Sequence, residues 1–399
     1  MYFYCCQHGF FAAQNYAITV INLYRKFKAD RIFTGLEMLD NATLVTDDAG
    51  KVIEVLPYEE HDAQYYTGIL CPGLINAHCH LELSHLKGQI PRHTGLINFV
   101  QQVLTLRGGN EERRDVSMTN AHKEMIGNGI VAVGDICNTA DTVNVKRNST
   151  MQWRNFVEVS GFVEAASRKR LDEALGIRSK FDEAFIVPHS SYSVSKKLLA
   201  LIADLNEKFV SIHNQESAEE DLLHKNGSGD FRELYKNLGI DISSFTPANI
   251  SSFKFWAGFF SRQQNIISVH NTFIEPGDIE LAKNSGKSIW FCLCPNANLY
   301  IENTIPPVQM LRDKGCPIVL GTDSYASNDA LNIVNEMKTL QERIPGVPLK
   351  EMLGWATVNG AAALSFEGLG KFEAGCTPGI IAIDAGENDL LTGTVKRIL

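Results

Sequence analysis

The sequence is poor in the features that mark secreted, membrane-spanning and nucleic-acid-binding proteins. Its nine cysteines are scattered and include no Cys-x-x-Cys pair, so neither a disulfide framework nor a zinc knuckle is predicted. No stretch reaches the roughly 18 apolar residues that a membrane helix needs. The net charge of −9 and a pI near 5.7 leave no diffuse basic surface for a phosphate backbone. We therefore expect a cytoplasmic protein with a small-molecule partner, and neither nucleic acid nor membrane binding.

The composition that remains is that of an ordinary globular protein. Hydrophobic residues make up 44% of the chain and charged residues 21%, and the mean hydropathy is −0.09. A chain of 399 residues can bury a sizeable core. Its length fits two or three units, or one large α/β barrel with a small appendage.

The two ends of the chain differ from its middle. Residues 1–22 lack the basic start, apolar run and cleavage site of an export signal, and we expect them to form an extension outside the fold. Short alternating segments then predict β-hairpins, because Asp and Gly residues separate them. These segments are Ala29–Phe33, Ala42–Thr46 and Val52–Leu56, and the strand-like run Ile380–Ile383 could return to pair with them.

Between the ends, apolar runs alternate with amphipathic helical stretches. This alternation predicts parallel βαβ units, and eight of them predict a barrel. The expected strands are Gly68–Asn76, Ile130–Ile136, Phe156–Phe162, Phe185–Pro188, Val210–His213, Ile266–His270, Ile289–Cys294 and Ile318–Thr322. The least regular interval, 224–257, is either a helix with an active-site loop or a surface insertion without a role in chemistry.

Histidine or aspartate recurs where these strands end. In a parallel barrel the active site lies at the carboxyl ends of the strands, so side chains at these ends meet at one mouth. The residues are His78 and His80 after the first strand, His189 after the fourth, His213 after the fifth, His270 after the sixth and Asp323 after the eighth. A single histidine at a strand end is usually structural, but five such strand ends in one barrel favour a metal site.

Three imidazoles and one carboxylate would form the metal site. His78 and His80 lie two residues apart, so both side chains can point to one place, and His213 and Asp323 complete the set. Such ligands suit zinc or ferrous iron. A bound metal with an open position lowers the pKa of water from ~15.7 towards ~7, which makes water the expected nucleophile.

Two further residues have the chemistry to handle protons. Glu216 lies three residues beyond His213, where the turning chain could bring its carboxylate over the water; it could instead be a first-turn helix residue that the helix dipole favours. His270 is expected to orient the nucleophile rather than to bind the metal.

These motifs together resemble the amidohydrolase superfamily, and more narrowly its mononuclear deaminase and chlorohydrolase-like branch. The matching segments are Pro72–His80, His213–Glu216, Val269–His270 and Gly321–Ser324. The resemblance implies a (β/α)8 barrel over 68–368 and a small β-sandwich built from 23–67 and 369–399. It also implies that His78, His80, His213 and Asp323 are metal ligands, that Glu216 shuttles a proton, and that His270 contacts the attacking water.

The resemblance also bears on metal number and substrate. Relatives with two metals use a carboxylated lysine near the fourth strand, but Phe185–His189 has no lysine, which favours one divalent metal and leaves His189 as a substrate contact. The segment Leu81–Gly88 is similar to that of aminodeoxyfutalosine-type deaminases, which implies that Glu82 lines the pocket.

We therefore expect hydrolytic deamination of an amino-substituted purine or nucleoside-like heterocycle, with Glu216, His270 and Asp323 as catalytic residues. Metal-bound hydroxide would attack the ring carbon that carries the amine. Two alternatives stay open: hydrolysis of another leaving group, such as chloride or an amide, and a barrel that binds without catalysis. Barrels of this kind often form dimers, so a homodimer is one expected assembly.

Overall fold

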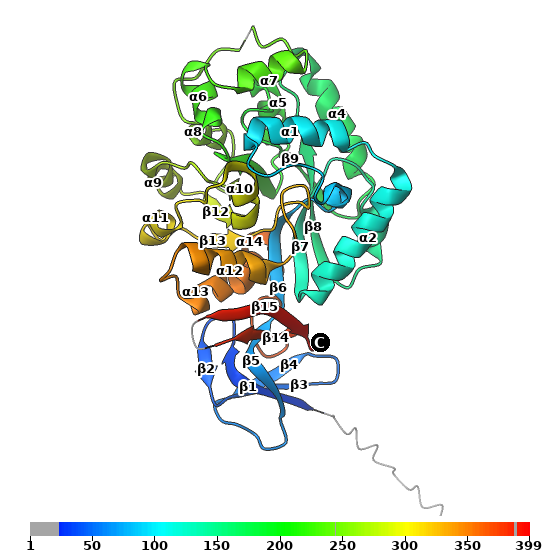
Figure 1. Ribbon diagram of the computed structural model, residues 1–399, viewed down its shortest axis with the longest axis vertical. Coiled ribbons are helices and arrows are strands. Elements are labelled where there is room, and N and C mark those ends of the chain that lie inside the picture. Colours follow the sequence, from blue (N-terminus) through cyan, green and yellow to red (C-terminus); the bar gives the residue numbers. More distant parts are fainter. Residues whose placement is uncertain (1–23, 244, 387–388) are drawn as a thin grey trace, which may run out of the picture.

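The computed structural model describes residues 24–243, 245–386 and 389–399 (Figure 1). Residues 1–22, for which the sequence predicts an extension, lie outside this range. Two parts are visible in Figure 1: a large part of strands and helices, and below it a smaller sheet that combines the blue amino-terminal and red carboxyl-terminal strands. The smaller part is therefore built from both ends of the chain.

In the described residues, the large part contains eight strands in two parallel four-stranded sheets. One sheet has the order β6 (Leu74–Cys79), β7 (Ile130–Cys137), β8 (Gln152–Val159) and β9 (Ala184–Pro188). The other has the order β10 (Phe209–Asn214), β11 (Asn265–His270), β12 (Ser288–Leu293) and β13 (Ile318–Leu320). The prediction of alternating parallel strands and helices is confirmed, with shifts of a few residues at the strand boundaries.

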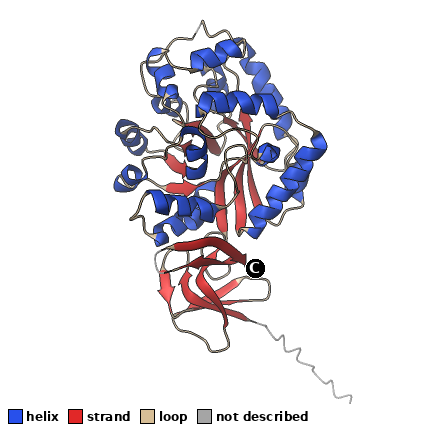
Figure 2. Ribbon diagram, viewed as in Figure 1, coloured by secondary structure: helices blue, strands red, loops and turns tan. Residues whose placement is uncertain are grey.

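Helices surround these strands, which lie at the centre of the large part (Figure 2). The α-helices are α1 (Gly95–Leu106), α2 (Glu111–Gly127), α3 (Val143–Arg147), α4 (Ser167–Arg178), α5 (Lys196–Ala203), α6 (Glu219–Asn226), α7 (Phe231–Asn237), α8 (Ser252–Ala257), α9 (Pro276–Asn284), α10 (Pro295–Glu302), α11 (Val308–Asp313), α12 (Ile333–Arg343), α13 (Leu349–Gly354) and α14 (Gly360–Leu364). Shorter turns are the 3-10 segments η1 (Leu81–Leu86) and η2 (Glu164–Ala166) and the π-helical η3 (Trp355–Asn359).

The two parallel sheets meet at two seams. Single β-bridges join Cys79 to Asp323 and Ser190 to His213, where a closed barrel would have continuous ladders. The eight strands therefore follow barrel order, but within the described residues the hydrogen-bonded ring is not closed. Both bridges involve a predicted metal ligand, so the seams run directly into the candidate site.

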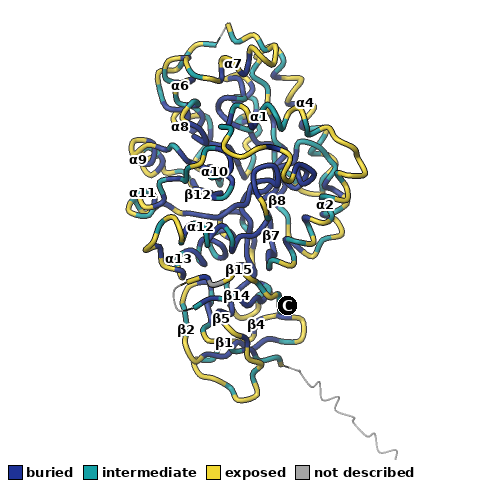
Figure 3. The backbone as a smooth tube through the Cα atoms, in the orientation of Figure 1, coloured by how far each residue is buried: buried dark blue, intermediate teal, exposed yellow. Residues whose placement is uncertain are grey.

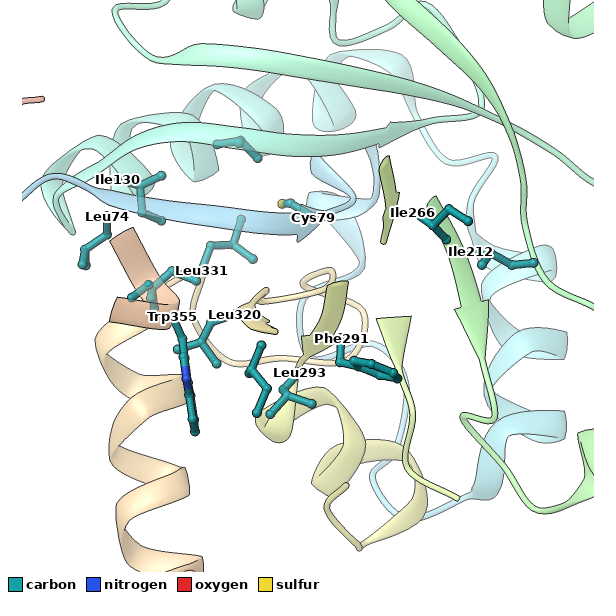
Figure 4. Packing of buried hydrophobic residues seen from close by; sticks show 14 of the residues in the cluster. Leu74, Cys79, Ile130, Ile212, Ile266, Phe291, Leu293, Leu320, Leu331 and Trp355 are labelled. Atoms are coloured by element: carbon teal, nitrogen blue, oxygen red, sulfur yellow. The ribbon is translucent and has the colours of Figure 1, made fainter. Parts of the chain in front are cut away.

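The core is organised by the alternation of side chains along these strands. Ile267 and Val269 belong to the cluster enclosed by the strands, whereas Ile266 belongs to the cluster between strands and helices. Figure 4 shows members of this second cluster, including Ile212 and Phe291. Figure 3 shows buried chain through the middle of the large part and exposed chain mostly along its outer edge. Burial of each such large apolar side chain stabilises the fold by roughly 1.5–3 kcal/mol.

The smaller part is one mixed seven-stranded sheet. Its strands are β1 (Arg25–Phe33), β2 (Met38–Asp40), β3 (Thr43–Thr46), β4 (Val52–Leu56), β5 (Gln64–Pro72), β14 (Ile380–Ala385) and β15 (Leu390–Arg397). The predicted β3–β4 hairpin is confirmed. β14 joins the same sheet as the amino-terminal hairpins, but it pairs with β5 rather than with the predicted hairpin strands. A β-sandwich is not confirmed, because all seven of these strands lie in a single sheet among the described residues.

One predicted strand, Gly68–Asn76, is wrong in its extent. Its first half belongs to β5 in the mixed sheet, and its second half belongs to β6 in the parallel sheet. The break falls after Pro72, which has no N–H for a ladder. At Gly73 an added Cβ would lie 2.2 Å from Val131 Cγ1, so only glycine fits where the chain passes between the two sheets.

The interval 224–257 holds more helix than the sequence indicated. It contains the end of α6 and all of α7 and α8, and residues around α7 line the cavity over the candidate metal donors that is described below. None of the helices in the described residues combines the length and the apolar character needed to cross a membrane.

Candidate active site and metal centre

The strand ends bring nearly all of the predicted site residues to one mouth. His78 lies in β6, with His80 just beyond it, while His213 and His270 lie at the ends of β10 and β11. Asp323 follows β13 by three residues. His78, His80, His213 and Asp323 are all buried, and their ligand atoms lie within 4.8 Å of one another.

The separations among these atoms suit a tetrahedral ion. The Nε2 atom of His80 lies 3.2 Å from Nε2 of His78 and 3.2 Å from Nε2 of His213. The Asp323 Oδ1 atom lies 3.5 Å from His78 Nε2 and 3.4 Å from His80 Nε2. Two ligands at zinc distances of about 2.0–2.1 Å in a tetrahedron lie ~3.3 Å apart, so the donors fit such an ion.

The protonation of these donors also suits a metal. Burial lowers the pKa of His78, His80 and His213 below that of free histidine, which keeps the imidazoles neutral. The Nδ1–H of His213 donates to the His189 carbonyl at 2.9 Å, so its Nε2 lone pair faces the other donors. Burial alone would raise the pKa of Asp323, but His80, His270 and the Ser327 hydroxyl hold it below the usual range.

A second group of polar side chains lies beside these donors. The His270 Nε2 atom is 3.5 Å from Glu216 Oε1. The Asn298 Nδ2 atom donates to Nδ1 of His270 at 3.2 Å, so the His270 proton lies on Nε2 and points towards Glu216. Burial and the nearby Asp323 carboxylate raise the pKa of Glu216 well above its usual value. This carboxyl group can therefore exist in either protonation state during a reaction.

Several residues at this mouth have left-handed backbone angles, which non-glycine residues rarely adopt; they include Gln215 (φ 44°), His270 (φ 71°) and Asp323 (φ 56°). In a regular strand, residue 270 would share the helix-facing side of Ile266. The left-handed turn is associated instead with a His270 side chain that lines the cavity. Such strain costs about 1–3 kcal/mol at each residue and clusters at functional sites.

A cavity of about 490 Å³ opens over the donors. Its inner end is lined by His80, His213, Glu216, His270 and Asp323. Its outer wall is apolar and comes from α1 and from the region of α7, through Leu96, Phe99, Val100, Val103, Leu234 and Tyr235. The shape suits an organic molecule with a polar reacting end and a less polar far end.

The two predicted substrate contacts differ in position. His189 lines the cavity, and its Nδ1 atom is held by the Ser193 hydroxyl at 2.7 Å. Glu82 is not among the cavity-lining residues, because η1 folds its carboxylate back onto the protein. There it accepts hydrogen bonds from the N–H groups of Asn138 and Thr139, both at 3.0 Å.

Sequence reasoning assigned no role to three residues of the site. Glu158 lines the cavity from β8. A carboxylate within a strand that was otherwise predicted to be buried is the sequence feature that could have identified it. Asn298 is fully buried beside His270. Gly321 leaves room for His78, one of the candidate metal ligands, because an added Cβ would lie 2.8 Å from the His78 Cβ atom.

Neutral histidines and a carboxylate at the carboxyl ends of parallel strands, with a second carboxylate over them, are the arrangement of a metal-dependent hydrolase. The chain belongs to the amidohydrolase family, whose model matches residues 69–397.

Similar proteins include an adenosine deaminase of Helicobacter pylori, 26% identical over 368 residues that cover 85% of this chain and 86% of the relative. Among solved structures, the aminofutalosine deaminase of Helicobacter pylori in complex with methylthio-coformycin has a TM-score of 0.76 at 22% identity and covers 93% of this chain and 94% of its own. An adenosine deaminase of Xanthomonas campestris with bound zinc has a TM-score of 0.69 at 20% identity and covers 90% and 84%. The likeness in structure supports the fold.

Proposed function

We propose that this protein is a hydrolytic deaminase of an adenine nucleoside or a close derivative, and that it releases ammonia from the ring amine. The observation that carries the proposal is the Glu216 carboxylate beside four converging metal donors, at the inner end of a cavity that suits a nucleoside. The curated relative named adenosine deaminase spans most of the chain and supports the same class of substrate.

His78, His80, His213 and Asp323 would hold one divalent metal ion, and we propose zinc as the native ion. When bound, such an ion supplies a water whose pKa is lowered from ~15.7 towards ~7, and hence a nucleophile at neutral pH. The donor distances near 3.3 Å and the neutral imidazoles support a single ion at this place.

Glu216 has the position of a proton carrier. As a carboxylate it takes a proton from the attacking water, and as a carboxylic acid it gives this proton to the ring nitrogen next to the reacting carbon. Burial and the Asp323 carboxylate raise its pKa, so the protonated form is more accessible than in a free carboxyl group. His270 donates from Nε2 and orients the attacking oxygen, while Asn298 keeps that proton on Nε2.

The far part of the cavity would bind the rest of the nucleoside. His189 offers a ring nitrogen at the inner end, where it can hydrogen-bond to the base. The apolar wall from α1 and α7 would cover the part of the substrate farthest from the reacting carbon.

The remaining proposals concern the architecture, location and assembly of the protein. We propose that the eight parallel strands act as a (β/α)8 barrel over 68–368, and that residues 23–67 and 369–399 form a separate β-domain. The Cys79–Asp323 and Ser190–His213 bridges, which join the two sheets in barrel order, support the barrel. A cytoplasmic location and a homodimer complete the proposal.

The test is ammonia release by zinc-loaded protein from adenosine, 5′-substituted adenosines, guanine, aminopyrimidines and a chlorotriazine. We expect ammonia from the adenosines, with replacement of the amine by oxygen in the product. Chloride release without ammonia, or activity on guanine or aminopyrimidines alone, would contradict the proposal.

A further inference from the structure

Glu158 carries a buried carboxylate oxygen that the protein leaves without a hydrogen-bond donor. Its side chain is only 5% exposed and lines the cavity. Oε1 accepts from Asn138 Nδ2 at 3.0 Å, and Asn138 is in turn held by Arg107 at 2.7 Å. Oε2 has no hydrogen-bond partner among the residues that the structure describes. A buried acceptor of this kind is costly unless a ligand completes it.

The nearest candidate inside the protein does not supply that donor. His213 Nδ1 lies 3.5 Å from Glu158 Oε2, but its proton is already donated to the His189 carbonyl at 2.9 Å. The Asn138 amide, for its part, is used by Oε1. The Glu158 carboxylate is therefore fixed in place in the wall of the cavity, with one oxygen left without a donor.

A second metal ion is a poor explanation for this oxygen. Ligand atoms of Glu158, His189 and His213 lie within 4.8 Å of one another. However, His213 Nε2 faces His80 Nε2 at 3.2 Å in the main donor set, and its Nδ1 carries the proton described above. Only two donors remain, fewer than the three or four that a stable site uses.

The chemistry of an adenine nucleoside restricts which substrate group can donate a hydrogen bond to Glu158 Oε2. In adenine the only N–H groups belong to the amine that is removed, and the ring nitrogens are acceptors. The remaining donors are the hydroxyl groups of the sugar. Resting on the proposed function, we propose that Glu158 is a specificity residue that binds the 2′,3′-diol of the substrate ribose through Oε2.

The experiment compares kcat/KM for adenosine, 2′-deoxyadenosine and 3′-deoxyadenosine in the zinc-loaded wild type and in Glu158→Gln, which keeps the shape but loses the charged acceptor. We expect the wild type to prefer adenosine over at least one deoxy analogue by about 10-fold to 100-fold, the usual range for a hydrogen bond to a charged group. Glu158→Gln should lose most of this preference, because the variant slows adenosine more than the deoxy analogue. Zinc content and kcat/KM of the exposed control Glu164→Gln should match the wild type.

Two results would overturn the inference while the proposed function stands. One is a wild type that deaminates all three nucleosides equally. The other is a Glu158→Gln variant that slows all three by the same factor, which is what a role in orienting His213 alone would produce. Absence of ammonia from every adenine nucleoside would overturn the proposed function and, with it, this inference.

Discussion

The mixed sheet and the two parallel sheets are both built from buried apolar strands, but they differ in the residues that occupy their left-handed turns. In the mixed sheet, several left-handed positions are glycines, such as Gly50, Gly68 and Gly379, which adopt them without strain. At the mouth of the parallel strands, left-handed positions are held by Gln215, His270 and Asp323. The mixed sheet therefore has turns that are easy to form, whereas the mouth keeps costly ones.

Polar groups differ between the two regions in the same way. Strand faces in the mixed sheet bury Ile381 and Ile383 on one side and Ile380 and Ala382 on the other, in plain alternation. The mouth buries four histidines and several carboxyl groups, some with atoms that lack a hydrogen-bond partner within the described part of the chain. Buried polar groups are costly and cluster at functional sites. The difference therefore indicates that the mixed sheet has a structural role and that the mouth of the parallel strands carries the chemistry.

The largest expected effect is on the rate of deamination and comes from a residue at the mouth of the parallel strands. Glu216→Gln should lower kcat/KM for deamination by about 10²–10⁴-fold, because the amide cannot carry the proton. Bound zinc should stay at the wild-type level, since Glu216 is not one of the four proposed ligands. The matched control is Glu233→Gln on the exposed side of α7. An unchanged rate in Glu216→Gln would exclude the proposed proton path.

The next effect is on stability, just beneath the mouth. Lys146 and Asp135 form a buried pair at 2.5 Å, and Asp135 also accepts the Leu81 N–H at 2.8 Å, directly after His80. Lys146→Met should lower the free energy of unfolding by about 3–5 kcal/mol, because it leaves the carboxylate buried and unpaired. Urea titration measures this loss.

The double variant Asp135→Asn/Lys146→Met is the control for that pair. It should recover a substantial part of the loss, since neither partner is then charged. If the double variant were as unstable as Lys146→Met, packing rather than charge would account for the effect.

A comparable loss without a change in chemistry is expected from the mixed sheet. Ile383 in β14 is fully buried against the large part. Ile383→Ala should lower the free energy of unfolding by about 2–5 kcal/mol, and Ile383→Val by about 0.5–1.5 kcal/mol. In the folded protein kcat/KM should stay within about twofold of the wild type, as for distant independent sites. A large fall in rate would show that the sheet also shapes the mouth.

The smallest expected effect is a pH dependence of stability, and it comes from a residue outside both regions. Burial lowers the pKa of His224 in α6 to about 4 from the ordinary 6.5. The unfolded chain therefore binds a proton at higher pH than the folded one, and stability falls as pH drops from 6.5 to 4, by at most about 3 kcal/mol. His224→Phe keeps the stack on Phe255 and should reduce this slope. Equal slopes for the two proteins in urea titrations would contradict the assignment.

Sequence reasoning identified the strands and the four converging side chains that could hold a metal, because both follow strong rules. Apolar runs with helical spacers identify parallel strands, and polar residues at their carboxyl ends meet at one mouth. It failed where backbone geometry decides the outcome. The break between Pro72 and Leu74 depends on space around Gly73, and the place of Glu82 depends on how η1 folds back.

Glu158 and Asn298 show a second limit of the same kind. Both residues act through a partner from a distant part of the chain, Asn138 in one case and His270 in the other. No local sequence pattern predicts such pairs, because the two partners come together only when the strands are arranged around the site.

The most direct test of the account is anomalous X-ray scattering at the zinc edge from crystals of zinc-loaded protein. The account predicts one strong peak per chain, at about 2.0–2.2 Å from the Nε2 atoms of the three histidines His78, His80 and His213 and from the Asp323 carboxylate. Zinc found elsewhere, or a peak that any of these four side chains fails to reach, would contradict it.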